Sequence, residues 1–155
     1  MPRSQSLRRS PTTNELAAWR AFIETSERMR GAIGSRLQAD SGLSTGDYAV
    51  LLSLSEATGH RVRSSDLAAA IGWERSRLSH HLGRMEQRGL IRRDDCLTDN
   101  RGAEAVLTPE GAAAFRRASP PHLHAIQELF VSALTLEQLE AVTEISAALN
   151  SHLET

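Results

Sequence analysis

The chain has 155 residues, of which 40% are hydrophobic and 24% are charged, and its formal net charge is −1. This length and balance are typical of one soluble globular domain, or of one domain with an appended helical module, and they exclude a wholly disordered chain. The apolar runs are too short to span a bilayer, no secretory signal is visible, and a single cysteine excludes an intrachain disulfide framework. We therefore expect a cytoplasmic protein without a membrane partner.

Charge is distributed unevenly along the chain. Residues 61–117 contain eleven Arg and eight acidic residues, whereas residues 118–155 contain five Glu and no Arg. The chain has no Lys, and Arg suits bidentate contacts with phosphate and guanine, although a GC-rich codon bias explains the same preference. The central segment is therefore the part of the chain best suited to face a polyanion.

The N-terminal part is predicted to contain a short arm and one long helix. Residues 1–13 are rich in Ser and Arg, and we expect them to form a disordered arm. Thr12 and Glu15 then match a capping box, and apolar residues recur at helical spacing behind them. This pattern predicts an amphipathic helix over 14–38, within an N-terminal dimerisation segment of residues 14–43.

Two further helix starts follow. Ser44 as the N-cap and Asp47 three residues later match a second capping box and predict a second helix. Ser64 or Ser65 is expected to cap a short third helix over 66–71, which a glycine closes. This third helix and the fourth, which Gly72 and Trp73 separate, are typical of a helix-turn-helix.

A fourth helix and a β-hairpin complete the central segment, residues 44–107. The fourth helix is predicted over about 74–88, with its apolar residues on one face. Residues 90–93 and 103–107 are predicted as strands on either side of a polar, Gly-containing turn. This order of elements predicts a winged helix-turn-helix that binds DNA.

The C-terminal segment, residues 108–155, is predicted to form further dimerisation helices. Thr108 is expected to cap a fifth helix, and Pro120 and Pro121 are expected to kink or break it. The whole fold is then mainly α with a small β-hairpin wing. The apolar faces of the first, fifth and sixth helices exceed what the central core can bury, which predicts a homodimer.

Three stretches of this sequence carry a family resemblance. Residues 99–111 combine an Asp-x-Arg turn with Leu-Thr-x-x-Gly, residues 84–93 read RMEQRGLIRR, and residues 65–68 read SDLA. Together they resemble the wing, the recognition helix and the preceding helix of MarR-type regulators, and the order of elements agrees over about 14–153. The resemblance implies a sequence-specific transcriptional regulator, most often a repressor, that binds pseudo-palindromic double-stranded DNA as a homodimer.

The candidate DNA contacts lie on the fourth helix and on the wing. The resemblance implies that Arg101 enters the minor groove, and that Asp99 either supports Arg101 or is a plain turn residue. Ser64, Ser65 and Arg92 are candidates for phosphate contacts, although capping alone explains the two serines equally well. The side chains expected on the outer face of the fourth helix are Arg75, Ser76, Arg77, Ser79, His80 and Arg84.

The family's usual effector site lies between the first two helices and the fifth. A small effector, such as an anionic aromatic molecule, would change the spacing of the two recognition helices, which must be about 34 Å apart to fit DNA. Alternatively, the residues at this site form part of the dimer core and bind no ligand. The residues that the resemblance places there are Trp19, Met29, Arg30, Tyr48 and Leu52.

A histidine and a cysteine in the central segment are candidates for a sensing role. His81 stands where the family's helix usually carries an aliphatic residue, and it is either a buried core histidine or a sensor of pH or ligand. Cys96 lies near three arginines that favour a thiolate, but the family's oxidant-sensing cysteine usually lies near the N-terminus. His122 and His124 point to different sides of a helix, so we expect no metal site.

The other functional classes lack support in the sequence. No nucleophile–base pair, Gly-rich phosphate loop or metal set is present, so we expect neither an enzyme nor a cofactor. A winged-helix module that binds a protein partner, without specific DNA binding, is the alternative function. The outward arginines of the fourth helix favour DNA.

Overall fold

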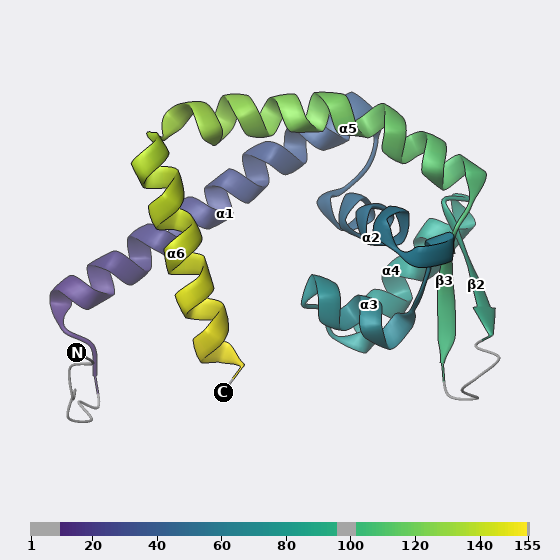
Figure 1. The fold of residues 1–155 in the computed structure, drawn as a ribbon, viewed down its shortest axis with the longest axis horizontal. Helices are drawn as coiled ribbons and strands as arrows, with labels where there is room; N and C mark the ends of the chain where they lie inside the picture. The colour runs from purple at the N-terminus through teal and green to yellow at the C-terminus, as the bar shows by residue number, and fades with distance from the viewer. Residues whose placement is uncertain (1–9, 96–101, 155) are drawn as a thin grey trace.

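The computed structural model describes residues 10–95 and 102–154, and it contains a helical arm and a compact module (Figure 1). The arm consists of α1, α5 and α6, with α5 lying along α1 (Figure 1). The module contains the remaining helices and the sheet, and this mainly α fold with a small sheet confirms the predicted fold class. The elements are α1 (Thr13–Ser41), α2 (Thr45–Glu56), the 3-10 turn η1 (Thr58–His60), β1 (Arg61–Arg63), α3 (Ser64–Ile71), α4 (Arg75–Gln87), β2 (Ile91–Asp95), β3 (Ala103–Leu107), α5 (Pro109–Leu129), the 3-10 turn η2 (Val131–Ala133) and α6 (Leu136–Leu153).

Capping boxes fix the first two helix starts, as the sequence predicts. At α1, Thr12 N donates to Glu15 Oε2 at 2.7 Å and Glu15 N donates to Thr12 Oγ1 at 3.3 Å. At α2, Ser44 and Asp47 exchange the same pair of bonds, each 3.0 Å long. Gly42, with φ of 71°, ends α1 in the left-handed conformation that glycine tolerates best. The disordered segment predicted for residues 1–13 is separate from this helical arm, and its residues 1–9 lie outside the described residues.

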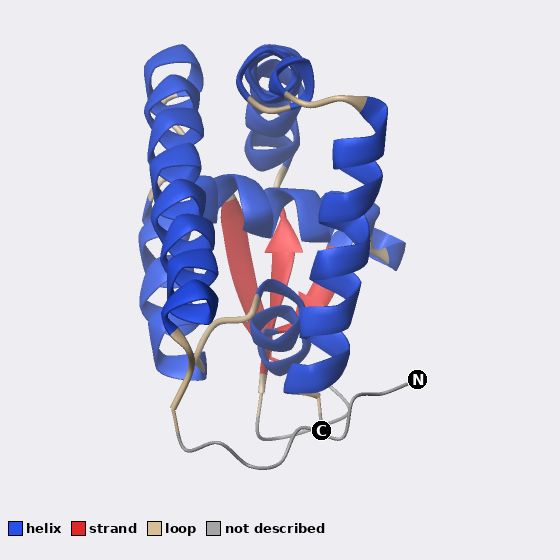
Figure 2. Cartoon of the chain, turned by 90° about the vertical axis from the view of Figure 1, so that its left-hand side faces the viewer, coloured by secondary structure: helices blue, strands red, loops and turns tan. Residues whose placement is uncertain are grey.

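The sheet has one strand more than the sequence predicts. Its three antiparallel strands lie in the order β1-β3-β2, and the helices pack around it (Figure 2). β1 is only three residues long, too short to show an alternating pattern. The predicted caps of α3 are wrong, because α3 begins at Ser64 after the N-cap Arg63 and no side chain caps it. Ser64 Oγ instead donates to Ala103 O at 2.9 Å, which ties α3 to β3.

Of the two outcomes predicted for the prolines of the fifth helix, a kink or a break, the break is wrong. α5 continues through Pro120 and Pro121 and follows an arched path across the molecule (Figure 1). Ala118 and Ala125, on either side of the prolines, are buried, so packing holds both halves of the helix in place. The residues four positions before the prolines, whose carbonyls lose a donor, are exposed to water.

The hydrophobic core lies mainly inside the module and includes Leu37 of α1 and Ala118 of α5 from the arm. Leu51, Leu54 and Leu67 are fully buried between α2, α3 and the sheet. In contrast, the described part of α6 contains no buried residue, and Ile145 is 54% exposed. Trp19 on α1 is 60% exposed. Within the described residues, the apolar side chains of α6 and of the N-terminal half of α1 therefore remain largely exposed. Among the described residues, no helix combines the length and apolarity needed to cross a membrane.

Candidate nucleic-acid interface

The helix α4 presents a polar, cationic face to solvent. Leu78, Leu82 and Met85 are at most 1% exposed and anchor its other face in the core, as the sequence predicts. The outward side chains therefore extend from a rigid, well-packed helix, which is the arrangement that reading a DNA groove requires. All six residues predicted on the outer face are exposed, namely Arg75, Ser76, Arg77, Ser79, His80 and Arg84.

Two of the outward arginines rest on aromatic side chains. The guanidinium carbon of Arg77 lies 4.0 Å above the ring of Trp73. Arg84 Nη2 donates to His81 Nδ1 at 3.2 Å, one helical turn earlier on α4. Trp73 and His81 contact each other edge to face, with their ring centroids 5.1 Å apart. These contacts restrict the orientations of both guanidinium groups before any ligand binds.

The end of α4 is tightly linked to the start of α5. Gly89, with φ of 76°, and Leu90 donate back to Glu86 O and Met85 O at 2.9 and 3.1 Å, which is a Schellman motif. Thr108 caps α5, and its hydroxyl also donates to Gly89 O at 2.6 Å. One side chain therefore joins the exit of α4 to the entry of the long helix.

Arg92, a predicted phosphate contact, is exposed, but its guanidinium group is already paired with the carboxylate of an acidic residue. Its Nε and Nη2 donate to the two carboxylate oxygens of Asp94 at 2.9 and 3.2 Å. Arg61 on β1 approaches the same carboxylate at 3.8 Å and pairs with Glu104 at 3.0 Å. The described part of the wing thus carries alternating charges, and a phosphate must compete with Asp94 for Arg92.

Arg93 is an exposed arginine of β2 that the sequence did not single out, and like Arg92 it is already paired with an acidic side chain. Its backbone N–H donates to Glu86 at 2.7 Å, which lowers the pKa of that carboxyl, and its Nε donates to the same group at 3.1 Å. A Cβ added at Gly83 would lie 3.7 Å from Arg93 Nη2, so the guanidinium group lies beside the middle of α4. Side chains two positions apart on a strand share a face, and Ile91, two positions before Arg93, is buried. The strand period therefore predicts that Arg93 points toward the same side of the sheet as Ile91.

The remaining predicted contacts are the two serines of α3 and the residues of the wing tip. Ser65 is exposed in the first turn of α3, whereas Ser64 is half-buried and bonded to β3. Arg101, Asp99 and Cys96 lie outside the described residues, so their predicted roles stay predictions.

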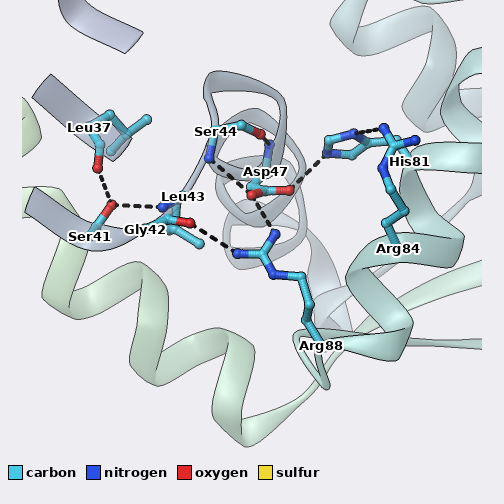
Figure 3. A network of polar contacts seen from close by, with 9 residues as sticks. All are labelled: Leu37, Ser41, Gly42, Leu43, Ser44, Asp47, His81, Arg84 and Arg88. Carbon is cyan, nitrogen blue, oxygen red and sulfur yellow. Dashed lines mark hydrogen bonds and ion pairs between the residues drawn. The ribbon is translucent and has the colours of Figure 1, made fainter. Parts of the chain in front are cut away.

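A buried polar network lies beneath α4 (Figure 3). Asp47 is 3% exposed, and its Oδ2 accepts from Arg88 Nη1 at 2.7 Å and from Ser44 N at 3.0 Å, while its Oδ1 lies 2.9 Å from His81 Nε2. Burial acts to raise the pKa of the Asp47 carboxyl, but the contacts with His81, Arg88 and Ser44 outweigh it and hold the pKa well below its ordinary value. Asp47 is therefore ionised and links α2 to α4.

The five predicted effector residues do not come together. Met29 and Arg30 line a groove of about 660 Å³ that α1 forms with Phe130 and Val142, but Trp19, Tyr48 and Leu52 are not among its lining residues. Met29 and Arg30 are thus the two of the five that line this groove, and the effector role of all five stays a prediction.

Tyr48 lies in a separate aromatic cluster beneath α5. Its ring centroid is 5.1 Å from that of Phe115 and 4.3 Å from that of His122, and its hydroxyl contacts Ser119 Oγ at 3.1 Å. Burial lowers the pKa of His122. Within the described ranges, no group of three metal-ligating side chains is found.

Comparison with known proteins assigns the chain to a family. The MarR family model matches residues 43–102. Sco3205, a MarR family transcriptional regulator from Streptomyces coelicolor solved in complex with DNA, is 34% identical, with a TM-score of 0.90 over 98% of this chain and 94% of that chain. The chain belongs to the MarR family. AbsC, another MarR family transcriptional regulator from Streptomyces coelicolor, is 37% identical, with a TM-score of 0.86 over 95% of this chain and 99% of that chain.

A curated relative extends the comparison of this MarR family chain to another bacterium. The transcriptional repressor MprA of Escherichia coli K12 is 27% identical over 107 residues, which are 69% of this chain and 60% of the repressor. The match therefore spans about three-fifths of that repressor's length. The residues matched by the MarR family model run from just before α2 to just before β3, so they include α4 with its outward arginines.

Proposed function

We propose that this MarR family chain is a cytoplasmic, non-enzymatic transcriptional regulator that binds double-stranded DNA sequence-specifically as a homodimer and represses until an effector binds. The main support for the proposal is the arrangement of α4. Its apolar face is anchored in the core, while Arg75, Arg77 and Arg84 project outward. A helix with this character fits the major groove, where Arg reads guanine edges or contacts phosphate. The similarity to Sco3205, a regulator solved with DNA, supports it.

The exposed apolar faces of the arm support the homodimer. Leu16 on α1 is 46% exposed, and Ile145 and Leu149 on α6 are 54% and 44% exposed. Contiguous apolar surface of this kind is usual at interfaces and rare on monomers. A second copy with the same faces is a self-complementary partner, and the resulting two-fold symmetry matches a pseudo-palindromic operator.

The DNA proposal is tested by selection followed by titration. The full chain is used to select duplexes from a random library, and its affinity for a selected duplex is compared with that for a scrambled one at several salt concentrations. Arg77→Ala should weaken binding to the selected duplex by roughly 5- to 150-fold, which is the effect of one lost base contact. The matched control is Arg28→Ala, which removes the same charge from an exposed position of α1.

Equal, weak binding of both duplexes by the unmodified chain would contradict the proposal, and would favour a module that binds a protein partner. Equal losses in the two variants would indicate that only net charge matters.

The homodimer is tested by measuring mass in solution. Sedimentation equilibrium should give twice the chain mass of 17.0 kDa, and Ile145→Asp on α6 should shift the mass toward a single chain. A single-chain mass for the unmodified protein at micromolar concentration would contradict the proposal.

The effector site is proposed at the groove lined by Met29 and Arg30. Its walls are mainly apolar, with Phe22 and Ile33 among them, and Arg30 adds one positive charge. This composition suits a small apolar molecule that carries an anionic group. The fluorescent anionic aromatic 1-anilinonaphthalene-8-sulfonate should bind there, and Arg30→Ala should weaken its binding while Arg28→Ala, one position outside the lining, should not. Equal binding by both variants would place the site elsewhere.

A further inference from the structure

His81 is a polar side chain at a core position of α4, and its two ring nitrogens have different partners. The residue is 8% exposed. Its Nδ1 faces Arg84 Nη2 at 3.2 Å, and its Nε2 lies 2.9 Å from Asp47 Oδ1 (Figure 3). Because a guanidinium group only donates, the contact with Arg84 requires the acceptor lone pair on Nδ1 and, in the neutral ring, the proton on Nε2, which lies 2.9 Å from the carboxylate.

The surroundings hold the imidazole in this position. Arg88 and the backbone N–H of Ser44 occupy the other carboxylate oxygen of Asp47, which leaves Oδ1 for His81. Gly46 makes room for the ring, because a Cβ there would lie 3.1 Å from His81 Cε1. The same Cβ would lie 2.6 Å from Trp73 Cη2, so a side chain at Gly46 would displace the aromatic pair.

The charged groups around His81 come from two helices. α2 contributes the carboxylate of Asp47, and α4 contributes the guanidinium groups of Arg84 and Arg88. Trp73 contacts the ring from the segment before α4 and supports Arg77 on its outer face. Beneath Arg84, His81 supplies the acceptor that pairs with the guanidinium.

We propose that His81 is a positioning residue that holds Arg84 in one orientation for DNA contact, and that Asp47 fixes the tautomer which this requires. The inference rests on the proposed DNA-binding function. An arginine that is ordered before binding loses less rotamer freedom when it meets DNA, and one such side chain changes affinity by roughly 2- to 12-fold. A core residue without this role would change only the stability of the fold.

Two amide variants separate the two contacts of the imidazole. His81→Asn places its amide oxygen near the Nδ1 position, so it retains an acceptor for Arg84. His81→Gln places its amide near the Nε2 position, so it retains a partner for Asp47 but loses the acceptor for Arg84. The pair is matched in chemistry, and circular dichroism and thermal unfolding of the full chain show whether each variant is folded.

The affinity of the full chain is measured for a duplex selected with the unmodified protein, in a double-mutant cycle with Arg84→Ala. His81→Gln should weaken binding by roughly 2- to 12-fold when Arg84 is present and by less than about 2-fold when it is absent. His81→Asn should bind within about 2-fold of the unmodified chain. Nitrogen NMR of the imidazole without DNA should show the proton on Nε2.

Each contrary result has a distinct meaning. Equal losses for His81→Gln in the presence and absence of Arg84, or equal losses for the Asn and Gln variants, would overturn the positioning role. A proton on Nδ1 would overturn it without any DNA measurement. An unmodified chain that binds no selected duplex would overturn the proposed function itself, whereas normal binding by Arg84→Ala would overturn only this inference.

Discussion

Replacing Asp47 with Asn keeps the shape of the side chain and removes its charge. Both carboxylate oxygens face donors, Oδ1 toward His81 and Oδ2 toward Arg88 and Ser44, so the new NH₂ group must face a donor in either orientation. Removing one member of a fully buried ion pair costs about 3–5 kcal/mol. Because Arg88 is 44% exposed and can turn to water, we expect a loss of about 2–3 kcal/mol.

The sign of the pH dependence follows from the lowered pKa of Asp47. Its ordinary value is 3.8, and the folded value is lower, so the folded chain holds the charged form more strongly. The contribution of Asp47 to stability is therefore fully present above that ordinary value and is lost as the pH falls below it, toward the folded pKa. The difference between the unmodified chain and Asp47→Asn should be constant from pH 7 to pH 5 and should narrow below about pH 4.

The assay is urea unfolding followed by circular dichroism, at one fixed protein concentration because association changes apparent stability. If the same proteins are unfolded by heat at pH 7, the lost free energy of unfolding corresponds to a decrease of roughly 5–10 °C in Tm. A difference between the two proteins that is the same at pH 7 and pH 3 would refute the reasoning, since it would show that the charge of Asp47 does not stabilise the fold.

Two further substitutions test other contacts in the structure. Gly111→Ala places a Cβ 1.9 Å from Leu90 O, so we expect a loss of about 2–3 kcal/mol in urea unfolding. Gly31→Ala, with no atom within 4 Å of the added Cβ, should instead gain up to about 1 kcal/mol, and similar values for the two variants would contradict the steric argument. Asp94→Asn frees Arg92 for phosphate and removes a repulsive charge, so affinity for duplex DNA should rise by roughly 3- to 10-fold at low salt, with a steeper salt dependence. An unchanged salt slope would show that Arg92 does not contact DNA.

The features that the sequence predicted best depend on neighbouring residues. The capping boxes at Thr12 and Ser44 need only the next three residues, and the left-handed end of α3 at Gly72 needs only one turn. The outward face of α4 follows from the helical period, which is a local property as well.

The features that it missed depend on residues far apart in the chain. His81 and Asp47 are separated by 33 intervening residues, and no local pattern records that pairing. Ser64 looked like a cap because its partner, the carbonyl of Ala103, belongs to a distant strand. The continuous course of α5 through Pro120 depends on burial against other helices, which sequence propensities do not include.

The hydroxyl of Thr108 has a mechanical consequence. It caps α5 and donates to Gly89 O, so the long helix and the exit of α4 share a single pivot. α5 has 21 residues, which makes it a lever arm of about 31 Å. By simple geometry, a rotation of about 6° at this pivot moves the far end by about 3 Å, close to the spacing of successive base pairs. Small movements between the arms of a dimer would therefore be sufficient to change the register of the reading helix on DNA.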